Sequence, residues 1–174
     1  MTMTMNEALT QMFLDVSRRT LVDEYWPRLR GCVESLTDDQ IWWRPNEASN
    51  SIGNILLHLN GNVRQWLVVP FLGGADERDR PAEFAQRDRI PGIDLLRALG
   101  ATIEQADMSL TRLTAADLLA VRDIQGYTAT GLDAVYHVVE HFGMHYGQIV
   151  YVTKQLRGVD LRFYKALDAT GRLE

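Results

Sequence analysis

Apolar residues recur at helical spacing in four long segments of the chain, and the first two lie before residue 75. The first segment runs from Asn6 to Leu36. Pro27 should kink or split it, because proline removes a backbone donor and crowds the preceding turn. The second segment begins at the N-cap residues 49–51 and is stopped by Pro70 and Gly73. Two long helices are therefore expected in the N-terminal half.

Two further helices are expected after a polar stretch, Ala75 to Arg89, which is typical of a long surface loop. Pro91 suits the first turn of a third helix that runs to about Leu113. Its expected core positions are Ile93, Leu96, Ile103 and Leu110. The fourth helix begins at the cap residue Thr130 and ends at Gly158.

The pattern as a whole indicates an all-α protein. No segment sustains an alternation of period two, and no repeat or linker divides the chain. The composition, 46% hydrophobic and 24% charged, is that of a globular protein. We therefore expect residues 1–174 to form a single-domain four-helix bundle.

Charge narrows the range of partners. The net charge is −5, and the arginines stand among acids, as in Asp76-Glu77-Arg78-Asp79-Arg80, with no basic face. Binding to nucleic acid or to anionic membranes begins with basic groups that neutralise phosphates, so neither partner is expected. A small-molecule substrate is the expected partner. Large apolar residues are expected on several faces of the bundle, which is compatible with a homodimer.

The one cysteine and the N-terminal sequence indicate in which cellular compartment the protein is expected. Cys32 is unable to form an internal disulfide, which fits a reducing cytoplasm, and its helical setting indicates a packed thiol. The N-terminus has no basic region of the kind found in signal peptides. No run approaches the ~18 apolar residues of a membrane span. A cytoplasmic location is therefore expected.

The four histidines carry the main chemical signal. His58 lies in the second helix, and His137, His141 and His145 lie in the fourth. Residues four apart on a helix differ by about 40° and ~6 Å of rise, so two such imidazoles can converge on one ion. The stripe that holds His141 and His145 continues through Gln148 and is flanked by apolar residues, so it should face the interior of the bundle.

The three histidines of the fourth helix span too great a distance along the helix axis to bind the same ion. His137 and His145 differ by ~12 Å along the helix axis, whereas metal–nitrogen bonds are ~2 Å. A pair from this row together with His58 would supply three nitrogen ligands, and one end of the row must do something else. The alternative is that each histidine is separately hydrogen-bonded in the core, as isolated core histidines usually are.

Two short segments resemble the DinB and YfiT-like family of metal-dependent enzymes. They are Ser51-Ile52-Gly53-Asn54-Ile55-Leu56-Leu57-His58 and His141-Phe142-Gly143-Met144-His145-Tyr146-Gly147-Gln148, and Trp42-Trp43-Arg44-Pro45 is similar to the segment that precedes the second helix in this family. The resemblance runs from about Thr20 to Gly158. One departure is Tyr146, where many relatives have arginine.

The resemblance implies a four-helix bundle of unusual connectivity and a specific ligand set. It implies that His58, His141 and His145 ligate one zinc or nickel ion with water completing the shell, and so selects His141 and His145 over His137 and His141. Related proteins include thiol S-transferases, which suggests a transferase that uses a low-molecular-weight thiol in detoxification or stress metabolism. The alternatives are a metal-dependent hydrolase of a small ester or amide, and a non-catalytic metal- or ligand-binding protein.

Several other residues have weaker indications. His137, one turn from His141, is a candidate general base or supporting donor, and equally a hydrogen-bonded core histidine. Asn54 and Asn62 either face a cleft or satisfy backbone groups, and Gln148 either supports the site or packs between helices. The tryptophans at 42, 43 and 66 either wall a pocket or belong to the core.

Overall fold

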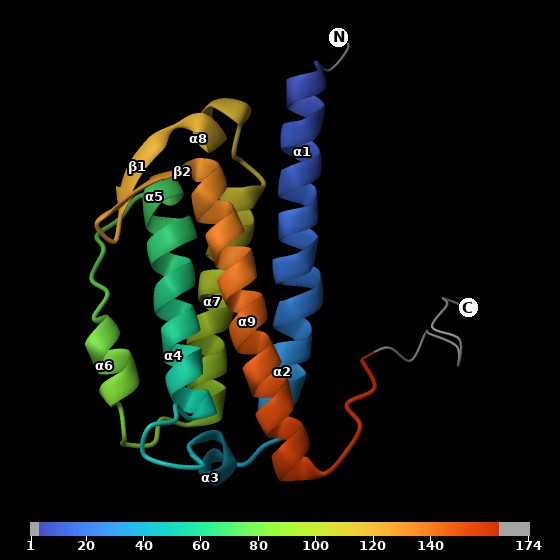
Figure 1. The fold of residues 1–174 in the computed structure, drawn as a ribbon, viewed down its shortest axis with the longest axis vertical. Coiled ribbons are helices and arrows are strands. Elements are labelled where there is room, and N and C mark those ends of the chain that lie inside the picture. Colours follow the sequence, from blue (N-terminus) through green and yellow to red (C-terminus); the bar gives the residue numbers. More distant parts are fainter. Residues whose placement is uncertain (1–3, 164–174) are drawn as a thin grey trace.

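The structure is a computed structural model that describes residues 4–163, and it is a bundle of four helical columns (Figure 1). Each of the first two columns contains a π-helical segment, labelled η. The elements are, in chain order, α1 (Met5–Arg18), η1 (Arg19–Tyr25), α2 (Trp26–Glu34), α3 (Asp38–Ile41), α4 (Ile52–Val63), η2 (Arg64–Val68), α5 (Val69–Leu72), α6 (Arg80–Ala85), α7 (Gly92–Leu110), α8 (Ala115–Leu119), β1 (Val121–Ile124), β2 (Tyr127–Thr130) and α9 (Gly131–Arg157). The predicted four-helix bundle is confirmed.

The connectivity follows from one long return path. The columns α4 to α5 and α7 run in the same direction, so the chain must travel back along the bundle between them (Figure 1). The segment from 73 to 91 does this and carries α6 along the outer side of α4 (Figure 1). The expected surface loop, Ala75 to Arg89, is therefore wrong in part, because its middle is a short helix packed on the bundle.

Both prolines inside the long columns follow a π-helical segment. Pro27 stands in the first turn of α2, directly after η1, and Pro70 stands in the first turn of α5, after η2. A proline has no N–H and crowds the carbonyl one turn earlier, and the wider π-helical turn accommodates both. The predicted interruption at Pro27 is thus a change of helix type within a continuous column.

Side-chain caps define the starts of the two helices that carry the histidines. Ser51 caps α4 and forms a capping box with Asn54, and Thr130 forms the same box with Asp133 at the start of α9. At its other end, α9 stops at Gly158, which has φ 62°. The boundaries that the sequence indicated for α9 are close to those observed.

The core runs the length of the bundle, with its largest fully buried side chains drawn from all four columns. These include Leu21, Leu29, Leu56, Leu59, Leu67, Leu99, Ile103, Phe142 and Ile149. Of the core positions expected in α7, Ile93 is wrong: it is 63% exposed, because it lies in the first turn at the end of the bundle. Leu95 and Leu99 face the core in addition to the other three.

A short hairpin, β1 and β2, covers the end of the bundle at which α9 begins (Figure 1). The strands pair antiparallel with Val121 opposite Thr130 and Ile124 opposite Tyr127. Gln125 and Gly126 form the turn, both with positive φ, at 57° and 77°. Separately, no helix within residues 4–163 is long and apolar enough to span a membrane.

Candidate metal centre

His58, His141 and His145 meet where α4 packs against α9. One ring nitrogen from each lies within 4.8 Å of the other two. The Nε2 atoms of His58 and His141 are 3.0 Å apart, and the His145 ring stands edge-on to both neighbours. The structure thus brings together the three residues that the sequence singled out, and metal ligation by them stays a prediction.

The outer nitrogens of these rings have three different environments. His58 Nδ1 lies 2.8 Å from a carboxylate oxygen of Glu83, and His145 Nδ1 lies 2.8 Å from the amide oxygen of Gln148. His141 Nδ1 is buried and has no hydrogen-bond partner among residues 4–163. A proton on Nδ1 of His58 and of His145 leaves Nε2 of each ring as the nitrogen with a lone pair.

The arrangement fits a divalent transition metal. Zinc–nitrogen bonds of about 2.0–2.1 Å in a tetrahedron place neighbouring ligand nitrogens about 3.3 Å apart, close to the 3.0 Å between His58 and His141. Burial lowers the pKa of His141 to about 3, with further lowering by the nearby His145 and His58. Burial also lowers the pKa of His145. Both rings are therefore neutral at physiological pH, as metal ligands must be.

The carboxylate partner of His58 comes from α6. Glu83 accepts from Arg78 Nε at 2.7 Å and from an Arg78 terminal nitrogen at 3.0 Å, so the two side chains form a bidentate pair. Their side chains are only 10% and 5% exposed. Burial opposes ionisation of Glu83, but hydrogen bonds from His58 and Arg78 outweigh it and lower the pKa of this carboxyl.

Sequence reasoning missed Glu83 and Arg78, because both lie in the stretch interpreted as a surface loop. A signal was present. Asp79 caps α6 by accepting from the backbone N–H of Ala82, and Pro81 stands in the first turn, which together indicate the start of a helix. That signal locates the helix but not the partner of Glu83, which lies 25 residues away in the chain.

His137 stands apart from the three converging rings. Its Nε2 lies 3.0 Å from the amide nitrogen of Asn62, and its ring packs on Trp66 with centroids 4.2 Å apart. The centroid of the His141 ring is 5.3 Å away. Burial lowers the pKa of His137 as well, so this ring is also neutral near pH 7.

A cavity of about 630 Å³ opens beside the histidines. Its lining includes two of the three converging histidines, His58 and His141, together with His137, Asn62 and Trp66. Arg78, Arg80, Asp133 and the β1–β2 turn with Tyr127 also line it. A small organic molecule can therefore lie beside two of the three converging rings, as a catalytic or binding site requires.

Of the remaining candidate residues, some line the cavity and others hold the neighbouring segments in place by hydrogen bonds. Asn62 and Trp66 line the cavity, whereas Asn54 donates to the backbone carbonyls of Glu83 and Gln86 and so holds α6 on α4. Trp42 is part of the support too, since its Nε1 donates to the carbonyl of Ile90 at 2.9 Å. Trp43 is 40% exposed and lines no part of this cavity.

Comparison with known proteins places the chain in context. The family described as "Protein of unknown function (DUF1572)" matches residues 8–167. Among curated proteins the comparison gave no match. Similar solved structures include a conserved protein from Enterococcus faecalis, with 16% identity and a TM-score of 0.63 over 91% of this chain and all of that one.

Two further similar structures are DinB-like proteins. One, from Bacillus subtilis, is 20% identical with a TM-score of 0.62 over 81% of this chain and 92% of its own. The other, from Bacillus cereus, is 13% identical with a TM-score of 0.59 over 80% and 89%. The DinB-like fold indicated by the sequence is thereby confirmed. At identities this low, the similarity shows a shared fold and does not show a shared function.

Proposed function

The chain belongs to the DUF1572 family, and we propose that it is a metal-dependent enzyme in which His58, His141 and His145 hold one divalent transition-metal ion, zinc or nickel. The observation that carries the proposal is the convergence of three imidazoles, two of which, His58 and His141, line an accessible cavity. An ion held by three histidines would keep its full double charge and an exchangeable position, and would supply electrostatic stabilisation for a thiolate or a hydroxide.

The proposed reaction is transfer of a low-molecular-weight thiol to a small electrophile. The thiol would have to come from outside, because Cys32 is fully buried and burial raises its pKa to about 11. The cavity of about 630 Å³ gives room for a thiol and an electrophile side by side, next to His141. Hydrolysis of a small ester or amide is the alternative, in which water takes the place of the thiol.

His137 is the proposed base for either nucleophile. Its ring lines the same cavity as His141, and burial lowers its pKa, so the ring is neutral at pH 7. The Nε2 lone pair accepts from the Asn62 amide, so a substrate would have to displace that amide before Nε2 takes a proton. Asn62, 3.0 Å from Nε2, and the Trp66 ring fix its orientation. Trp66 and Tyr127, which also line the cavity, offer ring surface to the apolar part of a substrate.

The first experiment is the metal content of untagged protein, measured by mass spectrometry, compared with a His141→Ala, His145→Ala double variant. We expect near one equivalent of zinc or nickel in the native chain and none in the variant, with the helical circular dichroism unchanged. Product formation from small electrophiles is then measured with and without added thiol. Activity that needs thiol supports the transferase, and activity without it supports the hydrolase. Native protein that stays metal-free after reconstitution would overturn both.

A further inference from the structure

Among the three converging histidines, His58 is the one whose outer nitrogen is held by a charged group. We propose that Glu83 and Arg78 form a positioning pair that fixes the tautomer and orientation of His58 and thereby sets the affinity of the site for metal. This inference rests on the proposed metal site and deepens it. Glu83 does not line the proposed substrate cavity, whereas Arg78 does, so Glu83 is the residue that acts through His58 alone.

The hydrogen-bond geometry directs Nε2 of His58 toward the other rings. Glu83 Oε2 accepts from His58 Nδ1 at 2.8 Å and from Arg78 at 3.0 Å, so both donors converge on one oxygen. This convergence accounts for the 3.0 Å between the Arg78 terminal nitrogen and His58 Nδ1. With its proton held on Nδ1 by a carboxylate, the ring presents the Nε2 lone pair to the centre and becomes a more basic ligand.

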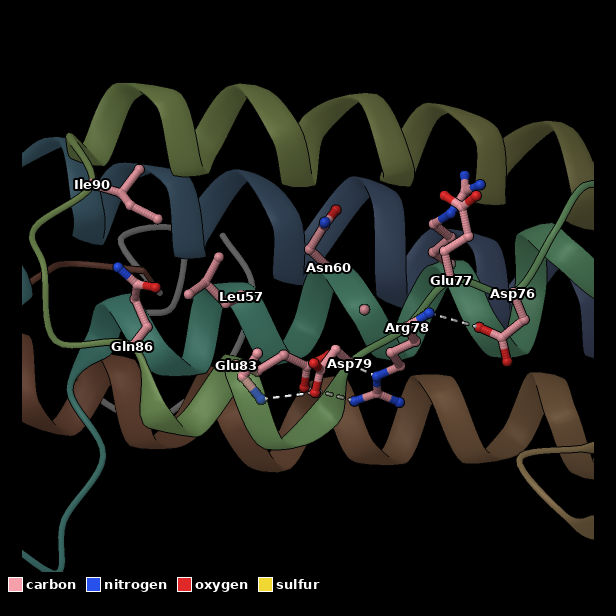
Figure 2. Close-up of a pocket in the computed structure, with 12 residues that line it drawn as sticks. Leu57, Asn60, Asp76, Glu77, Arg78, Asp79, Glu83, Gln86 and Ile90 are labelled. Carbon is pink, nitrogen blue, oxygen red and sulfur yellow. Dashed lines mark hydrogen bonds and ion pairs between the residues drawn. The ribbon is translucent and has the colours of Figure 1, made fainter.

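The charge of Arg78 is what makes a buried carboxylate tolerable at this place. Glu83 and Arg78 point toward one another across the wall of a second cavity, of about 390 Å³, on the outer side of α4 (Figure 2). A lone carboxylate as buried as this one would be strongly disfavoured, whereas a bidentate pair with guanidinium offsets that cost. The pair thus delivers a negative oxygen to His58 without leaving an uncompensated charge.

Several neighbours hold the pair in place on α4. The other terminal nitrogen of Arg78 donates to Gln65 Oε1 at 2.8 Å, and Gln65 donates to Asp76 at 2.7 Å. Gly61 leaves the space, because a Cβ there would meet the Glu83 carboxylate and lie 2.8 Å from Arg78 Nε. This arrangement is built around the contact with His58, and anchoring of α6 to α4 is already provided by Asn54.

Two variants of Glu83 separate positioning from simple anchoring. In metal-free protein, nitrogen-15 NMR of the imidazoles reads directly which nitrogen of His58 carries the proton. We expect Nδ1–H in the native chain and in Glu83→Gln, whose amide oxygen still accepts, and a mixture of tautomers in Glu83→Ala. Zinc affinity, measured by competition with a chromophoric chelator, should fall about 10- to 100-fold in Glu83→Ala and less in Glu83→Gln.

Glu77→Gln is the matched control. Glu77 is an exposed carboxylate of the same segment that lines the outer cavity, so the substitution removes the same charge. Its zinc affinity and its His58 tautomer should equal those of the native chain. Equal affinities of Glu83→Ala and Glu77→Gln for zinc, or a native His58 protonated on Nε2, would overturn the proposal.

Gly61→Ala tests the pair without changing any charge. The added methyl displaces Glu83 and Arg78, whose flexible side chains can move aside, and alanine favours the helix more than glycine does. We expect zinc affinity to fall about 10-fold or more and the His58 tautomers to become mixed, while the helical circular dichroism of the metal-free protein is unchanged. Unchanged affinity would contradict the proposal.

The tautomer measurement uses metal-free protein, so it decides the positioning of His58 whether or not the chain takes up metal. Failure of the native chain to bind zinc would instead refute the proposed function. The two failures are therefore distinguishable.

Discussion

The Nε2 atoms of His58 and His141 lie 3.0 Å apart, one from α4 and the other from α9. Two neutral rings protonated on Nδ1 would direct lone pairs at each other at this distance, an arrangement that a shared cation stabilises and an empty site does not. The packing of α4 on α9 sets this separation, and a divalent ion between the two nitrogens would relieve the repulsion of their lone pairs.

A metal ion that binds the folded chain and not the unfolded one stabilises the fold. Zinc at about 100 times its dissociation constant should add ~2.7 kcal/mol to the free energy of unfolding, which corresponds to a rise of roughly 5–10 °C in the thermal midpoint for a chain of this size. Scanning calorimetry with zinc and with a chelator measures it. The His141→Ala, His145→Ala variant should show no shift, and an equal shift there would place the metal elsewhere.

His137→Gln should keep the metal and lose activity. His137 lies one turn beyond the converging rings and contacts Asn62 and Trp66, so its removal leaves all three nitrogen ligands. Loss of a general base typically lowers kcat about 10²- to 10⁴-fold. Metal content by mass spectrometry and kcat on the substrate found for the native chain are the measurements. His145→Gln is the comparison, since it should lose the metal itself.

Cys32 should resist thiol reagents in the folded protein. It is fully buried, and burial raises its pKa to about 11 from an ordinary value near 8.5. At pH 8 almost no thiolate forms, and the reagent has no path to it. Absorbance after addition of a disulfide reagent should rise slowly in buffer and within the mixing time in denaturant. Rapid reaction in buffer would contradict this prediction and would make Cys32 a candidate nucleophile.

The sequence predicted the parts of the site that depend on helical periodicity. The shared stripe of His141 and His145, together with the further histidine His58 in the second helix, indicated the site, and the resemblance to DinB-like proteins selected this pair over His137 and His141. Both inferences need only the rise and twist of a helix or a short motif. A neighbour on the same helix, Gln148 beside His145, follows from the same spacing.

Glu83 and Arg78 could not be found in this way. Arg78 is one of five consecutive charged residues, and a run of charges does not reveal which member is buried. Its burial depends on the return path of the chain along α4, which local propensity does not specify. The β1–β2 hairpin was likewise missed, because strands of four residues give too few alternations and the Gln125-Gly126 turn lacks the usual Asn or Asp.

The three histidines of α9 make the stability of the metal-free protein depend on pH. Burial lowers the pKa values of His137, His141 and His145 in the fold, that of His141 to about 3, whereas an unfolded histidine titrates near 6.5. Between those values the unfolded chain binds more protons, so the free energy of unfolding is highest above about pH 6.5 and falls as the pH falls toward about 3. Urea unfolding between pH 7.5 and 4.5 measures the decline. A His141→Gln variant should decline less steeply, and parallel curves would contradict the lowered pKa.

Gly53 and Trp42 set the start of α4, and their contact predicts the cost of one methyl group. A Cβ at Gly53 would lie 2.7 Å from two atoms of the Trp42 indole, which is held by its hydrogen bond to the carbonyl of Ile90. The indole cannot move aside without breaking that bond. Overpacking typically costs ~1–3 kcal/mol, and the lost bond adds about 1 kcal/mol, against a helix-propensity gain of about 1 kcal/mol.

The overpacking terms are larger, so Gly53→Ala should lower the free energy of unfolding by roughly 1–3 kcal/mol. Gly31→Ala is the control, because a Cβ at Gly31 in α2 meets nothing within 4 Å and only the propensity gain of up to about 1 kcal/mol remains. Urea unfolding monitored by circular dichroism should therefore shift in opposite directions for the two variants. Equal gains would mean that Trp42 is free to move, and that the start of α4 is held by the Ser51 cap alone.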